Sequence, residues 1–196
     1  GISAREFRQT RIHLEDYSAV LFNSRTAIDH FFRIAQELRV TIPDTLKYFC
    51  ISESTAFYLQ KYIVYRKRKI FHANGSATDL IDIMKKHKDE RYLLPLSDLH
   101  SQEIPRLLDK GGFKYTTAIL YRTVCSDLTD LKDIHYDILV FFSPTGIKSL
   151  LQNFPDFKQN DTKIACFGST TAQAVREAGL NPDIEAPTPE APSMTM

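Results

Sequence analysis

Residues 17–28 read Y-S-A-V-L-F-N-S-R-T-A-I, and residues 136–147 read Y-D-I-L-V-F-F-S-P-T-G-I, so one pattern occurs twice in this chain. In each copy a short apolar run leads to a serine, Ser24 or Ser143, and a sequence with helical spacing follows. A short apolar run is typical of a parallel strand buried on both faces, and serine is a preferred N-cap residue. The repeat therefore predicts two related halves, each with a strand, a turn and a helix.

A second pair of matching stretches lies downstream of the first. Residues 47–56 read K-Y-F-C-I-S-E-S-T-A, and residues 163–172 read K-I-A-C-F-G-S-T-T-A. Both place Ser and Thr residues where a strand ends and a helix should begin. The first turn of a helix has free backbone N–H groups and a partial positive charge, which favour anions. We therefore expect a ligand with several anionic groups, bound in a cleft between the two halves.

Strands and helices alternate along the chain, which predicts an α/β fold with parallel sheets. The expected strands are residues 20–22, 48–51, 69–72, 92–94 and 114–124 in the first half, and residues 138–142, 164–167 and 183–185 in the second. The expected helix starts of the first half are Ser24, Ser52 or Ser54, Ser76 and Asp98. The helix after Ser52 or Ser54 should run through Tyr62, Ser76 should form a capping box with Asp79, and the helix after Asp98 should run to Lys110 and stop at Gly112. In the second half the expected starts are Ser143, which precedes Pro144, and Thr170 with Thr171.

Composition excludes several classes of protein. The 196 residues are 43% hydrophobic, which suffices for a packed core, and their formal charge is +1, which gives no general attraction to nucleic acid or membranes. No apolar run reaches the ~18 residues of a membrane helix. Three cysteines, an odd number, argue against a disulfide framework and for a cytoplasmic location. No metal-ligand spacing is present, so we expect no metal, and we assign no chemistry to any histidine.

The basic run at residues 66–69, R-K-R-K, has three interpretations. Nucleic-acid binding is one, but a short charge run is more often a solvated helix end. A weaker possibility is that the run attracts an anionic substrate toward the cleft.

Five stretches of the chain resemble the uroporphyrinogen-III synthase family. They are V-L-F-N-S at 20–24, S-E-S-T-A at 52–56, Y-R-T at 121–123, F-F-S-P-T-G at 141–146 and G-S-T-T-A at 168–172. They occur in order, with family-like spacing, over nearly the whole chain. The resemblance implies two similar parallel-sheet α/β domains, joined by two extended crossover segments, with the ligand cleft between them.

Domain boundaries follow from the same resemblance. Residues 4–120 would form a complete α/β domain, and residues 121–126 would cross between the domains. Residues 127–196 would be the C-terminal part of the second domain, whose first strand and helix are expected before Gly1.

The reaction that the resemblance implies is the cyclisation of linear hydroxymethylbilane to uroporphyrinogen III, with inversion of the terminal pyrrole and loss of water. That is a carbon–oxygen lyase (hydro-lyase) reaction, and the family uses neither metal nor organic cofactor. Tyr121 is the implied catalytic residue. The implied binding residues for the linear tetrapyrrole polycarboxylate are Asn23, Ser24, Arg25, Thr26, Ser54, Thr55, Ser97, Ser143, Gly146, Ser169, Thr170 and Thr171. We expect a monomer with no nucleic-acid or membrane partner.

Structural explanations exist for the same residues. Ser24 and Ser143 could serve only as N-caps, Thr55 and Thr171 could bond back to their own helices, and Tyr121 could be a core aromatic residue. A non-catalytic two-lobed module that binds a polycarboxylate is therefore the alternative function. A phosphate- or flavin-binding protein would need a glycine-rich loop after its first strand, and none is visible.

Overall fold

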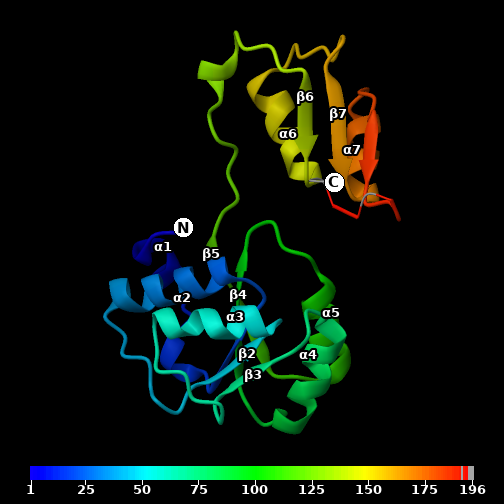
Figure 1. Ribbon diagram of the computed structural model, residues 1–196. Helices are drawn as coiled ribbons and strands as arrows, with labels where there is room; N and C mark the ends of the chain where they lie inside the picture. Colours follow the sequence, from blue (N-terminus) through cyan, green and yellow to red (C-terminus); the bar gives the residue numbers. More distant parts are fainter. Residues whose placement is uncertain (191, 194–196) are drawn as a thin grey trace. The chain divides into compact units, whose positions relative to one another are not determined.

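The computed structural model describes residues 1–190 and 192–193 (Figure 1). The chain divides into two compact units, Gly1–Thr123 and Val124–Met196, which we call the first and second unit. Both are α/β, and every strand pair in both sheets is parallel, as the alternation predicted. No helix in the described residues is long and apolar enough to cross a membrane.

The first unit contains a five-stranded sheet in the order β3-β2-β1-β4-β5. Its strands are β1 (Ala19–Phe22), β2 (Lys47–Cys50), β3 (Ile70–His72), β4 (Tyr92–Ser97) and β5 (Tyr115–Tyr121). Its helices are α1 (Ala4–Gln9), α2 (Arg25–Leu38), α3 (Glu53–Tyr58), α4 (Ala77–Met84) and α5 (Glu103–Gly111), with 3-10 turns at Leu14–Asp16, Leu59–Lys61 and Lys85–His87.

Strand β1 is buried on both faces because helices cover both sides of the sheet (Figure 1). Val20 and Phe22 point into a core formed with α1, α2 and α3, whereas Leu21 points into a core formed with α4 and α5. The continuous apolar run that predicted this strand is thus explained by burial on both sides.

The second unit repeats the first three strands of the first. Its sheet has the order β6-β7-β8, with β6 (Ile138–Phe141), β7 (Lys163–Phe167) and β8 (Ile184–Ala186). Its helices are α6 (Pro144–Asn153) and α7 (Ser169–Glu177), preceded by a 3-10 turn at Thr129–Leu131. Ala19 pairs with Lys47 in the first sheet, and Ile138 pairs with Lys163 in the second, so the repeated sequences share one register.

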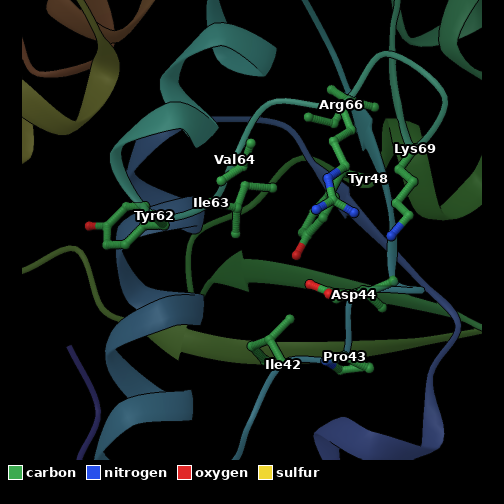
Figure 2. A pocket seen from close by; sticks show the side chains of 11 residues that line it. Ile42, Pro43, Asp44, Tyr48, Tyr62, Ile63, Val64, Arg66 and Lys69 are labelled. Atoms are coloured by element: carbon green, nitrogen blue, oxygen red, sulfur yellow. The ribbon is translucent and has the colours of Figure 1, made fainter.

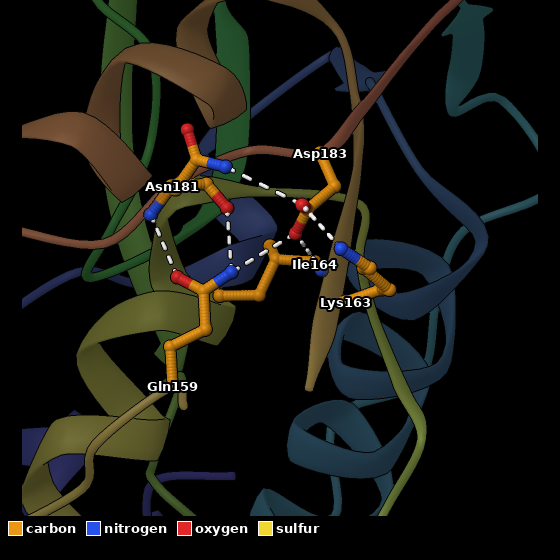
Figure 3. A network of polar contacts seen from close by, with 5 residues as sticks. All are labelled: Gln159, Lys163, Ile164, Asn181 and Asp183. Carbon is orange, nitrogen blue, oxygen red and sulfur yellow. Dashed lines mark hydrogen bonds and ion pairs between the residues drawn. The ribbon is translucent and has the colours of Figure 1, made fainter. Parts of the chain in front are cut away.

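A polar network fixes the start of β7 to the segment before β8 (Figure 3). One carboxylate oxygen of Asp183 accepts hydrogen bonds from the backbone N–H of Ile164 and from Gln159 Nε2, both at 2.9 Å. The other accepts from Lys163 Nζ and Asn181 Nδ2, both at 3.3 Å. The backbone N–H of Ile164 lowers the pKa of Asp183 most, and Lys163 and Asn181 lower it further.

The start predicted for α3 is confirmed at one of its two candidate serines, whereas the predicted end of α3 and the predicted start of α5 are wrong. Ser52, not Ser54, caps α3, and that helix ends at Tyr58 rather than Tyr62 because a 3-10 turn follows. Asp98 does not cap α5, which begins at Glu103. Its carboxylate accepts instead from the backbone N–H groups of Leu99 and Thr123, both at 2.9 Å, and so ties the loop to the residues after β5.

Two other caps lack one expected bond each. Ser76 caps α4 through the N–H of Asp79, but the Asp79 carboxylate accepts from Asn74 N, so the second bond of a capping box is missing. Ser143 has the N-cap conformation without a cap hydrogen bond, because its hydroxyl pairs with Thr145 Oγ1 at 3.0 Å. Gly112 does end α5, with a left-handed conformation at φ 68°.

Candidate functional site

The candidate residues of the first unit follow the carboxyl ends of its parallel strands. Asn23 and Ser24 follow β1, Ser52 and the start of α3 follow β2, and Ser97 and Tyr121 are the last residues of β4 and β5. The carboxyl ends of parallel strands meet at one edge of the sheet, which is where open α/β sheets bind ligands. The fold therefore brings these residues to one edge.

Ser24 and Tyr121 contact each other at this edge. The Ser24 hydroxyl accepts from the backbone N–H of Ala27 at 3.1 Å, as an N-cap does, and its Oγ lies 3.4 Å from Tyr121 Oη. Strand β4 separates β1 from β5 in the sheet, so this contact joins residues from non-neighbouring strands. Ser24 is thus both a cap and a partner of the candidate catalytic tyrosine.

Helix α2 also holds Tyr121 from the side. The His30 ring stacks on the Tyr121 ring with centroids 4.9 Å apart and an interplanar angle of 15°. Burial lowers the pKa of His30, and Arg33 lowers it further, so the stacked ring is neutral at neutral pH. Arg33 Nη2 donates to the carbonyl oxygens of Ile2 at 2.8 Å and Leu120 at 3.4 Å, and so fixes the backbone next to Tyr121.

His30 was not among the residues predicted from the sequence, because no metal-ligand spacing surrounds it. A usable signal exists, because Ser24, Ala27 and His30 are three residues apart and such residues share a helix face.

The hydroxyl groups at the start of α3 form a cluster. Ser52 Oγ accepts from the backbone N–H of Thr55 at 3.3 Å and lies 3.1 Å from Ser54 Oγ and 3.0 Å from Thr55 Oγ1. Ser54 is exposed, so its hydroxyl can reach a ligand, whereas Thr55 is buried. Ser52 organises the cluster, although the family resemblance did not single it out as a binding residue.

Asn23 carries a buried polar atom with no partner. Its Oδ1 receives no hydrogen bond from the described part of the chain. An unsatisfied buried acceptor costs about 1–3 kcal/mol, so a donor supplied by a bound molecule would remove a penalty there.

Positive charge at the edge comes from Arg25 in the first turn of α2. Its guanidinium lies 5.6 Å from the centre of the Tyr58 ring, and among the described residues no acid pairs with it. Thr26 beside it is exposed.

Ser97 is buried at a β-bulge opposite Tyr121, and its carbonyl accepts from His100 Nδ1 at 2.8 Å.

The second unit places its candidates at the equivalent edge of its own sheet. Ser143 and Gly146 follow β6, and Ser169, Thr170 and Thr171 follow β7. Ser169 and Thr170 are exposed, whereas Thr171 is 1% exposed.

Glycine at 146 has a packing explanation, since a Cβ there would lie 3.0 Å from a carbon of the Phe141 ring. The role of these five residues in binding stays a prediction, as does a cleft shared with the first unit.

The chemistry available at the first edge is that of hydroxyl groups, helix N-termini and a phenol. Metal binding has no support, because no three His, Cys, Asp or Glu residues cluster suitably in the described ranges. Such an edge suits the binding of carboxylates and hydrogen-bond donation to a leaving oxygen.

Comparison with known proteins finds one matching family. A family model described as uroporphyrinogen-III synthase HemD matches residues 2–196. Among curated proteins no significant match was found.

Solved structures show the same fold at low sequence identity. The uroporphyrinogen-III synthetase of Helicobacter pylori 26695 is 20% identical, with a TM-score of 0.61, over 92% of this chain and 82% of that one. A mutant uroporphyrinogen III synthase of the extremely thermophilic bacterium Thermus thermophilus is 16% identical, with a TM-score of 0.56, over 96% of this chain and 79% of that one.

Proposed function

The chain belongs to the uroporphyrinogen-III synthase family, and from this membership we propose how its residues cyclise linear hydroxymethylbilane to uroporphyrinogen III. The carboxyl edge of the first unit's sheet binds the substrate, and Tyr121 assists departure of the hydroxyl group. The observation that carries this proposal is the Ser24–Tyr121 contact at a ligand-binding edge, with His30 stacked on the phenol.

Substrate binding relies on hydrogen bonds to the acetate and propionate groups of the tetrapyrrole. Hydrogen bonds to a charged group contribute about 1.5–3 kcal/mol each, and a helix N-terminus adds about 0.3–1 kcal/mol. Arg25 and the exposed hydroxyls of Thr26 and Ser54 are proposed to contribute from the first unit. Ser143, Gly146, Ser169, Thr170 and Thr171 are proposed to contribute from the second unit.

Chemistry begins with loss of the hydroxyl group from the hydroxymethyl carbon. The electron-rich pyrrole expels the oxygen as the C–O bond breaks, and the Tyr121 O–H donates a hydrogen bond to the leaving oxygen. The proton released from the N–H of that pyrrole ends on the leaving hydroxide, so water is lost. The terminal pyrrole then attacks the resulting methylene carbon with its already substituted α-carbon, which gives a spiro intermediate. The older bond from that carbon to its methylene bridge breaks, the bridge bonds to the free α-carbon of the same ring, and loss of the proton on that carbon completes the inverted macrocycle. Placement of the flexible chain contributes more than any single side chain. The proposed class is therefore carbon–oxygen lyase.

Several finer assignments belong to the same proposal. Residues 4–120 act as one domain, residues 121–126 as a crossover, and residues 127–196 as part of a second domain that a further strand completes. Strand β6 supports the last point, since Ile138 and Val140 are 52% and 47% exposed while the matching strand β1 is fully buried. A monomeric state and a cytoplasmic location stay predictions.

The test is to mix the protein with enzymatically generated hydroxymethylbilane and to separate the product isomers by chromatography. We expect isomer III, formed faster than the spontaneous reaction. Isomer I alone, at the spontaneous rate, would instead favour the non-catalytic binding module.

A further inference from the structure

A cavity lies at the edge of the first unit's sheet that is opposite the proposed substrate site. It has a volume of about 230 Å³ and lies where β2 and β3 begin (Figure 2). Its walls come from residues 42–48 and 62–70, none of which belongs to the proposed substrate site. The strands are parallel, so their amino ends lie at the edge away from Ser24 and Tyr121.

Tyr48 presents an unpartnered hydroxyl to this cavity (Figure 2). The residue is 4% exposed, and its ring stacks between Phe22 and Phe32, with centroids 6.3 and 6.5 Å away. In the described part of the chain no group hydrogen-bonds to the hydroxyl. Burial raises the pKa of Tyr48, and Asp44 raises it further, so the hydroxyl remains a donor at neutral pH. A fixed and unused donor on a cavity wall suits an acceptor on a ligand.

Two cations line the same cavity. Arg66 and Lys69 form no ion pair with any acid among residues 1–190 and 192–193. The guanidinium of Arg66 and the carboxylate of Asp44 turn toward the Tyr48 hydroxyl in Figure 2, with Lys69 beside them. Two positive charges and one negative charge leave the cavity with a formal excess of positive charge.

The basic run at residues 66–69 thereby acquires a further interpretation. Its four residues form a turn that leads into β3, closed by a hydrogen bond from Lys69 N to Arg66 O at 2.9 Å, so they do not end a helix as expected. Arg66, Lys67 and Arg68 are exposed, as a solvated run should be, but only Arg66 and Lys69 line the cavity.

The remaining walls are apolar, and the space is small. Ile42, Ile63 and Val64 form one side. Pockets for drug-sized ligands measure about 300–1,000 Å³, so this cavity suits a molecule smaller than a tetrapyrrole. A ligand must therefore combine one acidic end with a short hydrocarbon body.

We propose that this cavity binds a small organic monocarboxylate. Arg66 and Lys69 pair with the carboxylate, the Tyr48 hydroxyl donates to it, and the hydrocarbon lies against Ile42 and Ile63. The proposal goes beyond the cyclisation reaction and does not depend on it, because it uses neither the residues nor the edge of the substrate site.

The test is an NMR titration of the full ¹⁵N-labelled chain with pentanoate at millimolar concentration. We expect saturable shifts at the amides of Leu46, Ile63 and Ile70, and no such shifts with the neutral analogue pentanamide. Arg66→Gln should weaken binding by about tenfold or more because a charge-assisted bond is lost, while Arg68→Gln, on the same turn but outside the cavity, should bind as the wild type does.

Tyr48→Phe provides an independent check. Because the hydroxyl has no partner in the described part of the free protein, this variant should unfold at the same temperature or higher, yet bind pentanoate more weakly. If Tyr48→Phe does not fold, the comparison of Arg66→Gln with Arg68→Gln still decides. The proposal would be overturned if pentanoate caused no shifts or if the two arginine variants lost equal affinity. It would also be overturned if inorganic phosphate, which cannot use the apolar wall, bound equally well.

Discussion

Tyr121 has three kinds of neighbour: a hydroxyl at its tip, an imidazole on its face and a fixed backbone beside it. Only the hydroxyl of the phenol can serve the reaction, and the ring serves packing. Replacing the residue by phenylalanine separates these roles, because the ring stays while the O–H is removed.

We expect Tyr121→Phe to lower kcat about 10- to 100-fold, at or below the lower end of the range for general acids, since the phenol assists a reaction that substrate placement dominates. The rate of formation of isomer III from hydroxymethylbilane measures this effect. The melting temperature should change little, because stacking on His30 is retained. An unchanged kcat would exclude the phenol from the chemical step.

His30 is expected to position Tyr121 without touching the substrate's reacting atoms. His30→Ala removes the stacked ring, so kcat should fall while KM changes little. A double-mutant cycle tests the mechanism, because His30→Ala should have almost no further effect in the Tyr121→Phe background. His30→Phe, which can still stack, should recover most of the activity. If the two losses simply multiply, His30 acts independently of Tyr121.

Sequence patterns locate the N-caps of helices only to within one or two residues. Ser52 and Ser54 both suit a helix start by composition, yet Ser52 alone has the N-cap conformation and bond. Ser52→Ala should therefore reduce the free energy of unfolding by about 0.5–2 kcal/mol. Ser54→Ala is the matched control and should be nearly neutral, since alanine is a better helix former than serine. Urea unfolding of both variants makes the comparison, and equal losses would contradict it.

The network around Asp183 connects β7 with β8 and should make stability depend on pH. The folded-state pKa of Asp183 is lowered, so its carboxylate contributes stability above the ordinary pKa of 3.8. That contribution is lost as pH falls below 3.8 toward the lower folded-state value. Asp183→Asn should remove this part of the pH dependence, measured by thermal unfolding between acidic and neutral pH. Identical pH profiles for the variant and the wild type would rule out such a role.

Strand positions could be predicted because burial on both faces leaves a local signature, as in residues 20–22. The actual role of Asp98 could not be predicted, because its carboxylate accepts a hydrogen bond from the backbone N–H of Thr123, which is distant in the sequence. The Ser24–Tyr121 contact has the same character. It depends on the order β1-β4-β5 in the sheet, and no short stretch of sequence carries that order. The types of site residue were therefore predictable, while their partners, including His30, were not.

At the scale of the whole molecule, the two units differ in how completely they bury their apolar residues. Both cores of the first unit consist of residues from Gly1–Thr123 alone and cover both faces of its sheet. The described residues of the second unit form one smaller core, while Ile138 and Val140 on β6 and Phe142 just after it are exposed. Exposed apolar side chains clustered on one strand favour association or binding of apolar dyes.

Expressed alone, residues 1–123 should therefore unfold cooperatively and give well-dispersed NMR spectra, because no described residue of the second unit belongs to their cores. Residues 124–196 alone should bind an apolar dye such as ANS and aggregate at lower concentration. Ile138→Thr with Val140→Thr should reduce both effects, since it lowers the apolar exposure of β6 while keeping β-branched side chains. Lys132→Thr, outside the strand, is the control. If the first fragment is unfolded, or if the second binds no dye, the two units do not differ in this way, and the apolar surface of β6 is no sign of a missing neighbour.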